Sequence, residues 1–452
     1  MSKRGMRRAP PPHPRPIHLR TLGIESLDSE GRGVARDDGK VVFVEGALPG
    51  EVVEAETTRR GSSFDQAQVV RVLRGSAGRR EPHCPHFGRC GGCATQHADL
   101  KTQMAAKQRW LEDCLQRIGK VRADTLLSIV YGEEWGYRHR ARMSVRGLPP
   151  PRGALVGFHE RKSSYVADMR QCDNLPPRIS RLITPLRELV TGLDMRERLP
   201  QVEIAVGDKV DVLVVRNLDP VSEADAAKLR SFADKEGVWL WLQPKGPATA
   251  APFHPLSMPD LDYTLPEFGI RIGFRPTDFI QVNHGVNRIL VRRAVRMLDP
   301  QPGERIADLF CGVGNFSLPL AASGSTVVGI EGAEELVERA RSNAEANGLA
   351  SRASFECADL FEAGAHKLVL SGPFDKMLID PPRSGAAEVI KALPDAWPSR
   401  IVYVSCDSAT LARDAGMLVS TKGFRLSAAG VVNMFPHTTH VESIALFERT
   451  AA

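Results

Sequence analysis

The segment RIADLFCGVGNFSLPLA, residues 305–321, runs from a short apolar strand through a glycine-containing loop into an apolar helix. From Gln301 onward, further apolar strands alternate with helical stretches such as AEELVERARSNAEANGL. Strands that alternate with helices are typical of a parallel sheet covered by helices on both faces. The sequence therefore predicts a doubly wound α/β domain, in which ligands bind at the carboxyl ends of the strands.

The loop of this segment contains Gly312 and Gly314, which would let the backbone approach a ligand closely. It lacks the third glycine of a dinucleotide-binding fingerprint and the lysine that ends a phosphate-binding loop. The next strand, TVVGIE, ends in Glu331, where a carboxylate can accept both hydroxyl groups of a ribose. This pattern favours S-adenosylmethionine as the cofactor, with a dinucleotide as the alternative.

A later strand ends in Asp380-Pro381-Pro382-Arg383. Methyltransferases that act on amino groups usually carry an aromatic residue after the two prolines, where it stacks on a flipped base. Arg383 and Ser384 take that place here. An exocyclic amine is therefore a disfavoured target.

The stretch IVYVSCDSATLARD, residues 401–414, places Cys406 where an apolar strand meets a turn. A thiolate that adds to carbon 6 of uracil converts the ring to an enolate whose carbon 5 can take a methyl group. We predict that Cys406 is this nucleophile, and a site that lowers its pKa would help. Cys311 and Cys357 are the alternatives, but one lies within the glycine loop and the other precedes the turn at Asp359. Both are expected to pack beneath the ligand.

Such a reaction also needs a base that removes the carbon-5 proton so that the thiol can leave. Glu442, in MFPHTTHVES, is the predicted base because a carboxylate near the end of the sheet could reach the same crevice. His437 and His440 are the alternatives. The target uridine is expected to be flipped out of RNA structure into the crevice.

A second group of cysteines lies earlier in the chain. Its members are Cys84, Cys90 and Cys93 in CPHFGRCGGC and Cys172 in MRQCDNLPP. Thiols this close together, separated by glycines, indicate a metal site. Four thiolates suit tetrahedral zinc or an iron–sulfur cluster, although the spacing differs from the paired motifs of zinc ribbons. His83 and His86 flank the group as alternative ligands, and a redox-sensing role stays open.

Short alternating runs from Ile17 to Leu73 predict a small antiparallel β-barrel. Its arginines could follow a nucleic-acid backbone or form an ordinary solvated surface. They are Arg20, Arg32, Arg36, Arg59 and Arg60. Beyond the barrel, a helix is expected at Thr102–Ile118, with one apolar face made by Met104, Leu111, Cys114, Leu115 and Ile118.

The run YRHRARMSVR, residues 137–146, alternates as a strand should and gathers arginines on one side. These are Arg138, Arg140, Arg142 and Arg146. Either phosphates or carboxylates must neutralise such a row.

Composition narrows the class of protein further. A chain of 452 residues suggests two or three domains, and a net charge of +6 suits a polyanionic partner. Eight cysteines without a secretory signal point to a reducing compartment, so we expect a cytoplasmic protein. No stretch has the length and apolar character of a membrane helix.

Taken together, five ordered motifs resemble those of the RNA uracil-5 methyltransferases that use S-adenosylmethionine. The motifs are FRPTDFIQVNHGVN, DLFCGVGNFSLPLA, IDPPRSG, VSCDSATLARD and MFPHTTHVES, and the resemblance extends from about Ile17 to Arg449. It implies that Cys406 is the nucleophile and Glu442 the base. It implies cofactor contacts from Gln281, Phe310, Asn315, Glu331, Asp359 and Asp380. It also implies that Cys84, Cys90, Cys93 and Cys172 hold a four-iron four-sulfur cluster.

The resemblance also implies a multidomain fold. Residues 1–13 would form a disordered basic tail and residues 14–75 a TRAM-type, OB-like RNA-binding β-barrel. Residues 76–275 would form a central α+β RNA-binding domain with the cysteine cluster, whose helix near residues 100–120 packs on the catalytic domain. Residues 276–452 would form a Rossmann-like class I methyltransferase domain.

Family members that combine the barrel with the cluster are similar to bacterial 23S ribosomal RNA enzymes, so 23S rRNA is the expected substrate. The chain is also expected to act as a monomer without an obligate protein partner. The alternatives are a transfer RNA uracil-5 methyltransferase, an RNA cytosine-5 methyltransferase and a noncatalytic RNA-binding protein. No cysteine precedes the prolines after Asp380, which argues against the cytosine enzyme.

Many relatives have Asn-Pro after the nucleophile, whereas this chain has Asp407-Ser408. A carboxylate turned toward the thiol there would raise its pKa.

Overall fold

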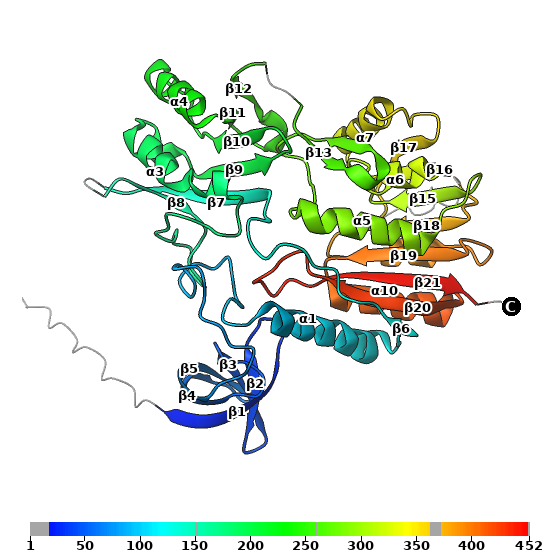
Figure 1. Cartoon of the computed structure of the whole chain (residues 1–452), viewed down its shortest axis with the longest axis horizontal. Helices are drawn as coiled ribbons and strands as arrows, with labels where there is room; N and C mark the ends of the chain where they lie inside the picture. The colour runs from blue at the N-terminus through cyan, green and yellow to red at the C-terminus, as the bar shows by residue number, and fades with distance from the viewer. Residues whose placement is uncertain (1–17, 150–151, 258–259, 362–371, 451–452) are drawn as a thin grey trace, which may run out of the picture. The chain divides into compact units, whose positions relative to one another are not determined.

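The computed structural model describes residues 18–149, 152–257, 260–361 and 372–450. The chain divides into two compact units, residues 1–80 and 81–452 (Figure 1). The basic tail expected at residues 1–13 lies outside the described residues. No helix in the described ranges is long and apolar enough to cross a membrane.

The first unit contains the expected small barrel, which is confirmed. Its strands are β1 (Leu19–Leu27), β2 (Gly33–Asp37), β3 (Lys40–Glu45), β4 (Val52–Arg60) and β5 (Phe64–Arg74), closed in the order β1-β2-β3-β5-β4. All neighbours are antiparallel except β3 and β5, which are parallel. Alternate residues such as Leu22, Val42 and Val53 fill the interior.

The barrel arginines do not form one uniform basic surface. Arg20 pairs with the buried carboxylate of Asp65 at 2.9 Å, and Arg32 pairs with Asp28 at 2.6 Å. By contrast, Arg59 and Arg60 are exposed at the end of β4. Two of the arginines therefore neutralise carboxylates of the barrel itself.

A mixed sheet forms the middle of the chain. Its order is β12-β11-β10-β9-β7-β8, made of β7 (Arg140–Gly147), β8 (Ala154–Gly157), β9 (Gln201–Val206), β10 (Asp211–Arg216), β11 (Trp239–Gln243) and β12 (Ala251–His254). Helices α3 (Ile183–Gly192) and α4 (Glu223–Glu236) pack on it through residues such as Leu186 and Leu229. The short helix α2 (Pro177–Ser180) precedes them.

Two arginines of the predicted row, Arg140 and Arg142 on β7, are neutralised within the protein. Arg142 lies 3.0 Å from the buried carboxylate of Glu203 on the neighbouring strand β9, and Arg140 lies 3.6 Å from the same group. The sequence allowed either phosphates or carboxylates to neutralise the row, and for these two arginines the neutralising group is a carboxylate of the protein. Arg146 is exposed.

The C-terminal part forms the predicted doubly wound sheet. Its strand order is β17-β16-β15-β18-β19-β21-β20-β6, and the strands are β15 (Arg305–Leu309), β16 (Thr326–Glu331), β17 (Ala353–Cys357), β18 (Lys376–Ile379), β19 (Arg400–Ser405), β20 (Phe424–Val432), β21 (Glu442–Arg449) and β6 (Thr125–Leu126). The first five in this order run parallel, and β21 runs antiparallel to β19. A hairpin of β13 (Asp262–Leu265) and β14 (Ile270–Gly273) precedes the sheet.

Helices cover both faces of this sheet (Figure 1). One face carries α5 (His284–Leu298), α6 (Ser317–Ala322) and α7 (Glu334–Ala346), and the other carries α1 (Leu100–Cys114), α9 (Ala387–Ala392) and α10 (Ser408–Thr421). The apolar stripe of each helix, with residues such as Leu290, Val337 and Leu411, meets strand residues that are buried on that side.

The buried face of helix α1 differs from the apolar face that was expected. Asp99 caps its first turn by accepting the Thr102 N–H at 2.8 Å, and a π-helical turn (η1, Leu115–Gly119) ends it. The buried residues are Gln103, Lys107, Leu111, Cys114 and Leu115, whereas Met104 is only partly buried and Ile118 is 49% exposed. Two polar side chains therefore occupy the face where the pattern predicted apolar ones.

The segment before the catalytic sheet contributes to that sheet directly. Helix α1 packs against α10 and β20, and β6 pairs in parallel with β20. A close approach of η1 to α10 requires glycine, because a Cβ at Gly416 would lie 2.8 Å from the Gly119 carbonyl oxygen. Residues 81–452, which include most of the predicted central region and all of the predicted C-terminal region, form one compact unit.

Candidate active site

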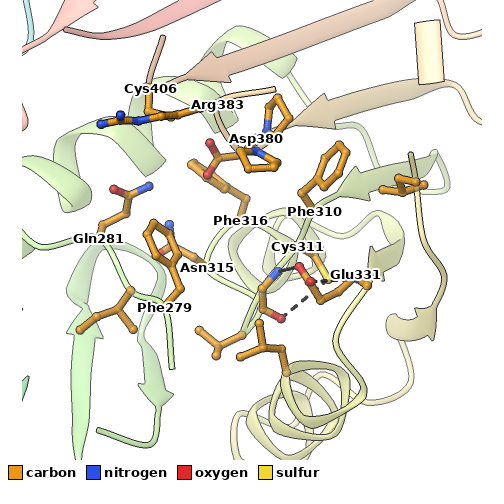
Figure 2. A pocket seen from close by; sticks show the side chains of 18 of the residues that line it. Phe279, Gln281, Phe310, Cys311, Asn315, Phe316, Glu331, Asp380, Arg383 and Cys406 are labelled. Carbon is orange, nitrogen blue, oxygen red and sulfur yellow. Dashed lines mark hydrogen bonds between the residues drawn. The ribbon is translucent and has the colours of Figure 1, made fainter. Parts of the chain in front are cut away.

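A pocket of about 500 Å³ opens at the carboxyl ends of β15, β16, β18 and β19. Every side chain predicted for catalysis or cofactor binding lines it. These are Gln281, Phe310, Asn315, Glu331, Asp359, Asp380, Cys406 and Glu442. Figure 2 shows Cys406, Asp380 and Arg383 toward one end of the pocket and Glu331 toward the other.

The strand order explains why residues so distant in sequence meet here. Strands β16 and β18 pair with opposite edges of β15, so the chain changes direction across the sheet at that point. Parallel strands end at one edge, and the change of direction leaves a crevice there. Because β21 runs antiparallel to β19, Glu442 at its start reaches the edge where β19 ends, beside Cys406.

The glycine loop has an unusual backbone that only partly depends on glycine. Gly312 and Gly314 have φ angles of +54° and +92°, and Phe310 has a φ of +62°. The Phe310 N–H is held by the Ile330 carbonyl at 2.8 Å. Positive φ in a non-glycine residue is costly and clusters at functional sites, which fits the place of Phe310 in the pocket wall.

The Glu331 carboxylate lies at the far end of the pocket, against the backbone of two loops. It accepts the Gly312 N–H at 3.1 Å and the Gly332 N–H at 2.8 Å. These bonds fix its orientation at the end of β16. Cys311 is buried but is among the residues that line the pocket, whereas Cys357 is not among them.

Two residues that support Asn315 were not singled out from the sequence. The Asn315 side-chain oxygen accepts the Tyr263 hydroxyl at 2.8 Å and the Asn287 amide at 2.9 Å. Its amide donates back to Asn287 at 3.0 Å. Asn287 lies within the motif FRPTDFIQVNHGVN, but nothing in the pattern around Tyr263 marks it, since its role comes from the fold alone.

Burial strongly raises the pKa of two aspartates at this edge of the sheet. Burial raises the pKa of Asp380 to about 7 and that of the neighbouring Asp308 to about 7 as well. Asp308 accepts a hydrogen bond from the Ser317 hydroxyl, at the start of α6. Asp308 lies within β15 and Asp380 directly follows β18, and removal of a carboxyl group from water disfavours its charged form.

The pocket does not lower the pKa of Cys406, although a lowered pKa would help a thiol nucleophile. Burial raises its pKa to about 11, Glu442 and Asp380 add to the rise, and Arg383 opposes it. Asp407 plays no part, because its carboxylate caps α10 by accepting the N–H groups of Ala409 and Thr410 at 3.0 and 2.9 Å. Asp407, which replaces the Asn found in many relatives, therefore caps α10 and is not turned toward the thiol.

Glu442 is better placed as a base than either histidine. It is 4% exposed and lines the pocket, and burial raises its pKa to about 8, with Asp380 adding to the rise and Lys107 and Arg383 opposing it. His437 stacks on Trp135 with ring centroids 3.8 Å apart and does not line the pocket. His440 accepts a hydrogen bond from Arg383 at 2.8 Å and borders a different cavity.

That second cavity, of about 290 Å³, gathers the other cysteines. Cys84, Cys90, Cys93 and Cys172 all line it, together with His86, whereas His83 does not. Burial raises the pKa of Cys172 to about 12, and neighbouring thiolates raise the pKa of each of the four. Among the described residues, no group of three or more His, Cys, Asp or Glu side chains is arranged to hold a metal ion.

The fold and pocket together define an S-adenosylmethionine-dependent methyltransferase. A sequence model of the tRNA (Uracil-5-)-methyltransferase family matches residues 260–450, and one of the TRAM domain matches residues 20–70. Over 427 residues the chain is 58% identical to the 23S rRNA (uracil(1939)-C(5))-methyltransferase RlmD of Aromatoleum aromaticum, covering 94% of this chain and 99% of that protein. The enzyme of the same name from Nitrosospira multiformis is 59% identical over 428 residues, covering 94% and 98%.

This chain belongs to the family of RNA uracil-5 methyltransferases. A similar solved structure is the tRNA (uracil-54, C5)-methyltransferase of Pyrococcus abyssi in complex with S-adenosyl-L-homocysteine. Its TM-score is 0.72 at 23% identity, over 95% of this chain and 100% of that one, which establishes a shared fold.

Proposed function

We propose that this protein transfers a methyl group from S-adenosylmethionine to carbon 5 of a uridine in 23S ribosomal RNA. The observation that carries the proposal is the meeting of Cys406 and Glu442 in one pocket with all the predicted cofactor residues. The choice of 23S rRNA is supported by the names of relatives that match the chain almost end to end.

In this proposal the end of the pocket near Glu331 holds the cofactor, which supplies an electrophilic methyl group when bound. The Glu331 carboxylate, fixed by the loop backbone, accepts the ribose hydroxyls. The remaining contacts come from Gln281, Phe310, Asn315, Asp359 and Asp380. The uridine, flipped out of the RNA, enters at the end near Cys406 and meets Phe279, which is 67% exposed in the pocket wall.

The reaction proceeds in two halves on the uracil ring. The Cys406 thiolate forms a bond to carbon 6, and the electron pair displaced onto carbon 5 takes up the methyl group. The Glu442 carboxylate then accepts the proton from carbon 5, the C–H electron pair restores the ring double bond, and the sulfur–carbon bond breaks to release the thiolate. A protonated Glu442 favours thiolate formation, and an ionised Glu442 is needed for release.

The proposal is tested by mass-spectrometric mapping of 5-methyluridine in ribosomal and transfer RNA from cells with and without the gene. We expect one or more uridines of 23S rRNA to lose their methyl group when the gene is deleted, and to regain it on complementation. A change confined to transfer RNA would instead support a transfer RNA uracil-5 methyltransferase, the activity named in the description of the matching family model.

We also propose that the four cysteines of the second cavity hold a four-iron four-sulfur cluster. The chemistry of the residues supports this group although their side chains are not arranged around a common point: all four cysteines line one cavity, and the N–H groups of Gly92 and Asn174 point to Cys90 Sγ at 3.4 Å and Cys93 Sγ at 3.2 Å. Hydrogen bonds to sulfur are typical of such sites. A bound cluster would supply a rigid covalent link between Cys172 and the Cys84–Cys93 segment.

Purified protein should contain about four iron atoms and four acid-labile sulfides per chain. Cys93→Ser is expected to lose most of the iron and to lower the melting temperature, because the link between the two segments is lost. Cys357→Ser, which alters a cysteine outside the cavity, should keep its iron. Retention of iron by Cys93→Ser, or purification with zinc alone, would contradict the assignment.

The remaining proposals concern how the protein meets RNA. We propose that the TRAM barrel binds the rRNA backbone, with the exposed Arg59 and Arg60 as contacts. The central region, residues 76–275, would bind RNA as well. A ribosomal RNA substrate implies action in the cytoplasm, and we propose that the chain acts as a monomer.

A further inference from the structure

The segment that carries the proposed base is fixed by residues from the other end of the chain. Residues 433–441 connect β20 to β21, and Glu442 follows directly. The Lys107 ammonium on α1 donates to the Asn433 side-chain oxygen at 2.8 Å and to the Phe435 carbonyl at 2.8 Å. Lys107 is only 5% exposed, so both bonds are shielded from water.

Neutral groups hold the same segment at further points. The Gln103 side chain accepts the His437 N–H at 2.8 Å, and the Tyr137 hydroxyl donates to the Pro436 carbonyl at 3.0 Å. Trp135 stacks on His437. These contacts would still hold residues 433–441 if Lys107 lost its charge. The effect of the Lys107 charge on Glu442 can therefore be tested separately from its role in holding the segment.

Lys107 also acts on the charge of the base. The ionisable groups that face the Glu442 carboxyl are Asp380, Arg383, Lys107 and Cys406. Asp380 opposes ionisation of Glu442, whereas Lys107 and Arg383 favour it. Of the two cations, Lys107 is the buried one and comes from an element outside the catalytic motifs.

We infer that Lys107 is a positioning residue for the base: it fixes the segment before Glu442 and favours the ionised carboxyl that must remove the carbon-5 proton. The inference rests on the proposed function. Burial and Asp380 raise the pKa of Glu442, Lys107 and Arg383 oppose the rise, and the pKa is about 8 with all of these groups in place. Burial lowers the pKa of Lys107, and the Glu442 carboxylate opposes that loss of charge, so each group of the pair favours the charged form of the other.

The reaction step that depends on Lys107 is release of the adduct. A protonated Glu442 cannot accept the carbon-5 proton, so the sulfur–carbon bond cannot break and the methylated RNA stays attached. The cation at position 107 lowers the pKa of Glu442, and its removal raises that pKa. The pH at which release reaches half of its maximum should then move upward.

The test uses the full-length protein and an unmodified 23S rRNA transcript. Lys107→Met removes both the charge and the hydrogen bonds, Lys107→Gln removes the charge and keeps a donor, and Lys107→Arg keeps the charge. Lys101→Met, on the exposed side of the same helix, is the matched control. For each variant, the fraction of protein attached to RNA on a denaturing gel and the rate of adduct release are measured from about pH 6 to about pH 10, with melting temperature and KM for RNA alongside.

We expect the release profiles of Lys107→Met and Lys107→Gln to move to higher pH by about one unit or more, a loss of about tenfold near neutral pH. Both should accumulate adduct at neutral pH and lose it at high pH, whereas Lys107→Arg and Lys101→Met should resemble the wild type. Wild-type profiles for both neutral variants, or an equal loss at every pH, would overturn the inference. If the wild type formed neither adduct nor 5-methyluridine, the proposed function itself would be wrong.

Discussion

Replacing Glu442 with glutamine is expected to arrest the reaction after methyl transfer, with the protein still covalently attached to methylated RNA. Glutamine matches the shape of glutamate, but its amide cannot accept the carbon-5 proton, so the sulfur–carbon bond to Cys406 persists. Turnover should fall by about 10²- to 10⁴-fold, the usual contribution of a positioned base. The adduct is measured as a slowly migrating band on a denaturing gel with methyl-labelled cofactor, and the band should carry the label.

The same carboxyl gives the wild-type reaction a pH dependence. Because burial raises the pKa of Glu442 to about 8, most of these groups are protonated at neutral pH. Adduct release should therefore accelerate as the pH rises from about 7 to about 9, and Glu442→Gln should release slowly throughout that range. His437→Gln and His440→Gln are the controls for the two alternative bases. Free turnover by Glu442→Gln, or an adduct that accumulates in either histidine variant instead, would show that another side chain accepts the carbon-5 proton.

Cys406→Ala is expected to bind RNA and cofactor but to transfer no methyl group. Without the sulfur, carbon 5 never gains the electron pair that captures the methyl group, and the loss should be on the order of 10⁴- to 10⁶-fold, as for other covalent nucleophiles. Methyl incorporation is measured with labelled cofactor, and binding by filter retention of the rRNA transcript. The void is small and at the pocket surface, so the melting temperature should change little.

A transcript containing 5-fluorouridine separates the role of Cys406 from that of the other pocket thiol. The fluorine on carbon 5 cannot leave as a proton does, so the wild type should become permanently attached. Cys406→Ala should form no such linkage, and Cys311→Ala should still form it. Attachment through Cys311 would reverse the assignment of nucleophile.

The sequence allowed the catalytic sheet and its pocket to be predicted because both depend on local signals. Apolar strands that alternate with helices specify a parallel sheet, and such a sheet brings its strand ends to one edge. Phe310, Asp380 and Cys406 each directly follow a strand and Glu331 ends one, so knowing the strands was enough to place them together.

Other features depended on partners that no local pattern reveals. Periodicity on α1 marks Leu111 and Cys114 as buried, but it cannot show that Gln103 and Lys107 are buried too, because their partners lie near the other end of the chain. Tyr263 likewise supports Asn315 only through the tertiary fold. The pKa of Cys406 likewise depends on the tertiary fold, because it is raised first by burial of the thiol and then by Glu442 and Asp380.

The pairing of β6 with β20 has a consequence for how the protein is made. Thr125 and Leu126 leave the ribosome long before Ala428 and Ala429, the residues they pair with. The catalytic sheet thus cannot be finished during synthesis, and its early segments must wait, unpaired, until almost all of the polypeptide has emerged. Such distant pairing slows folding and exposes the waiting segments to aggregation. We therefore expect yields of this enzyme to rise when translation is slowed or chaperones are abundant.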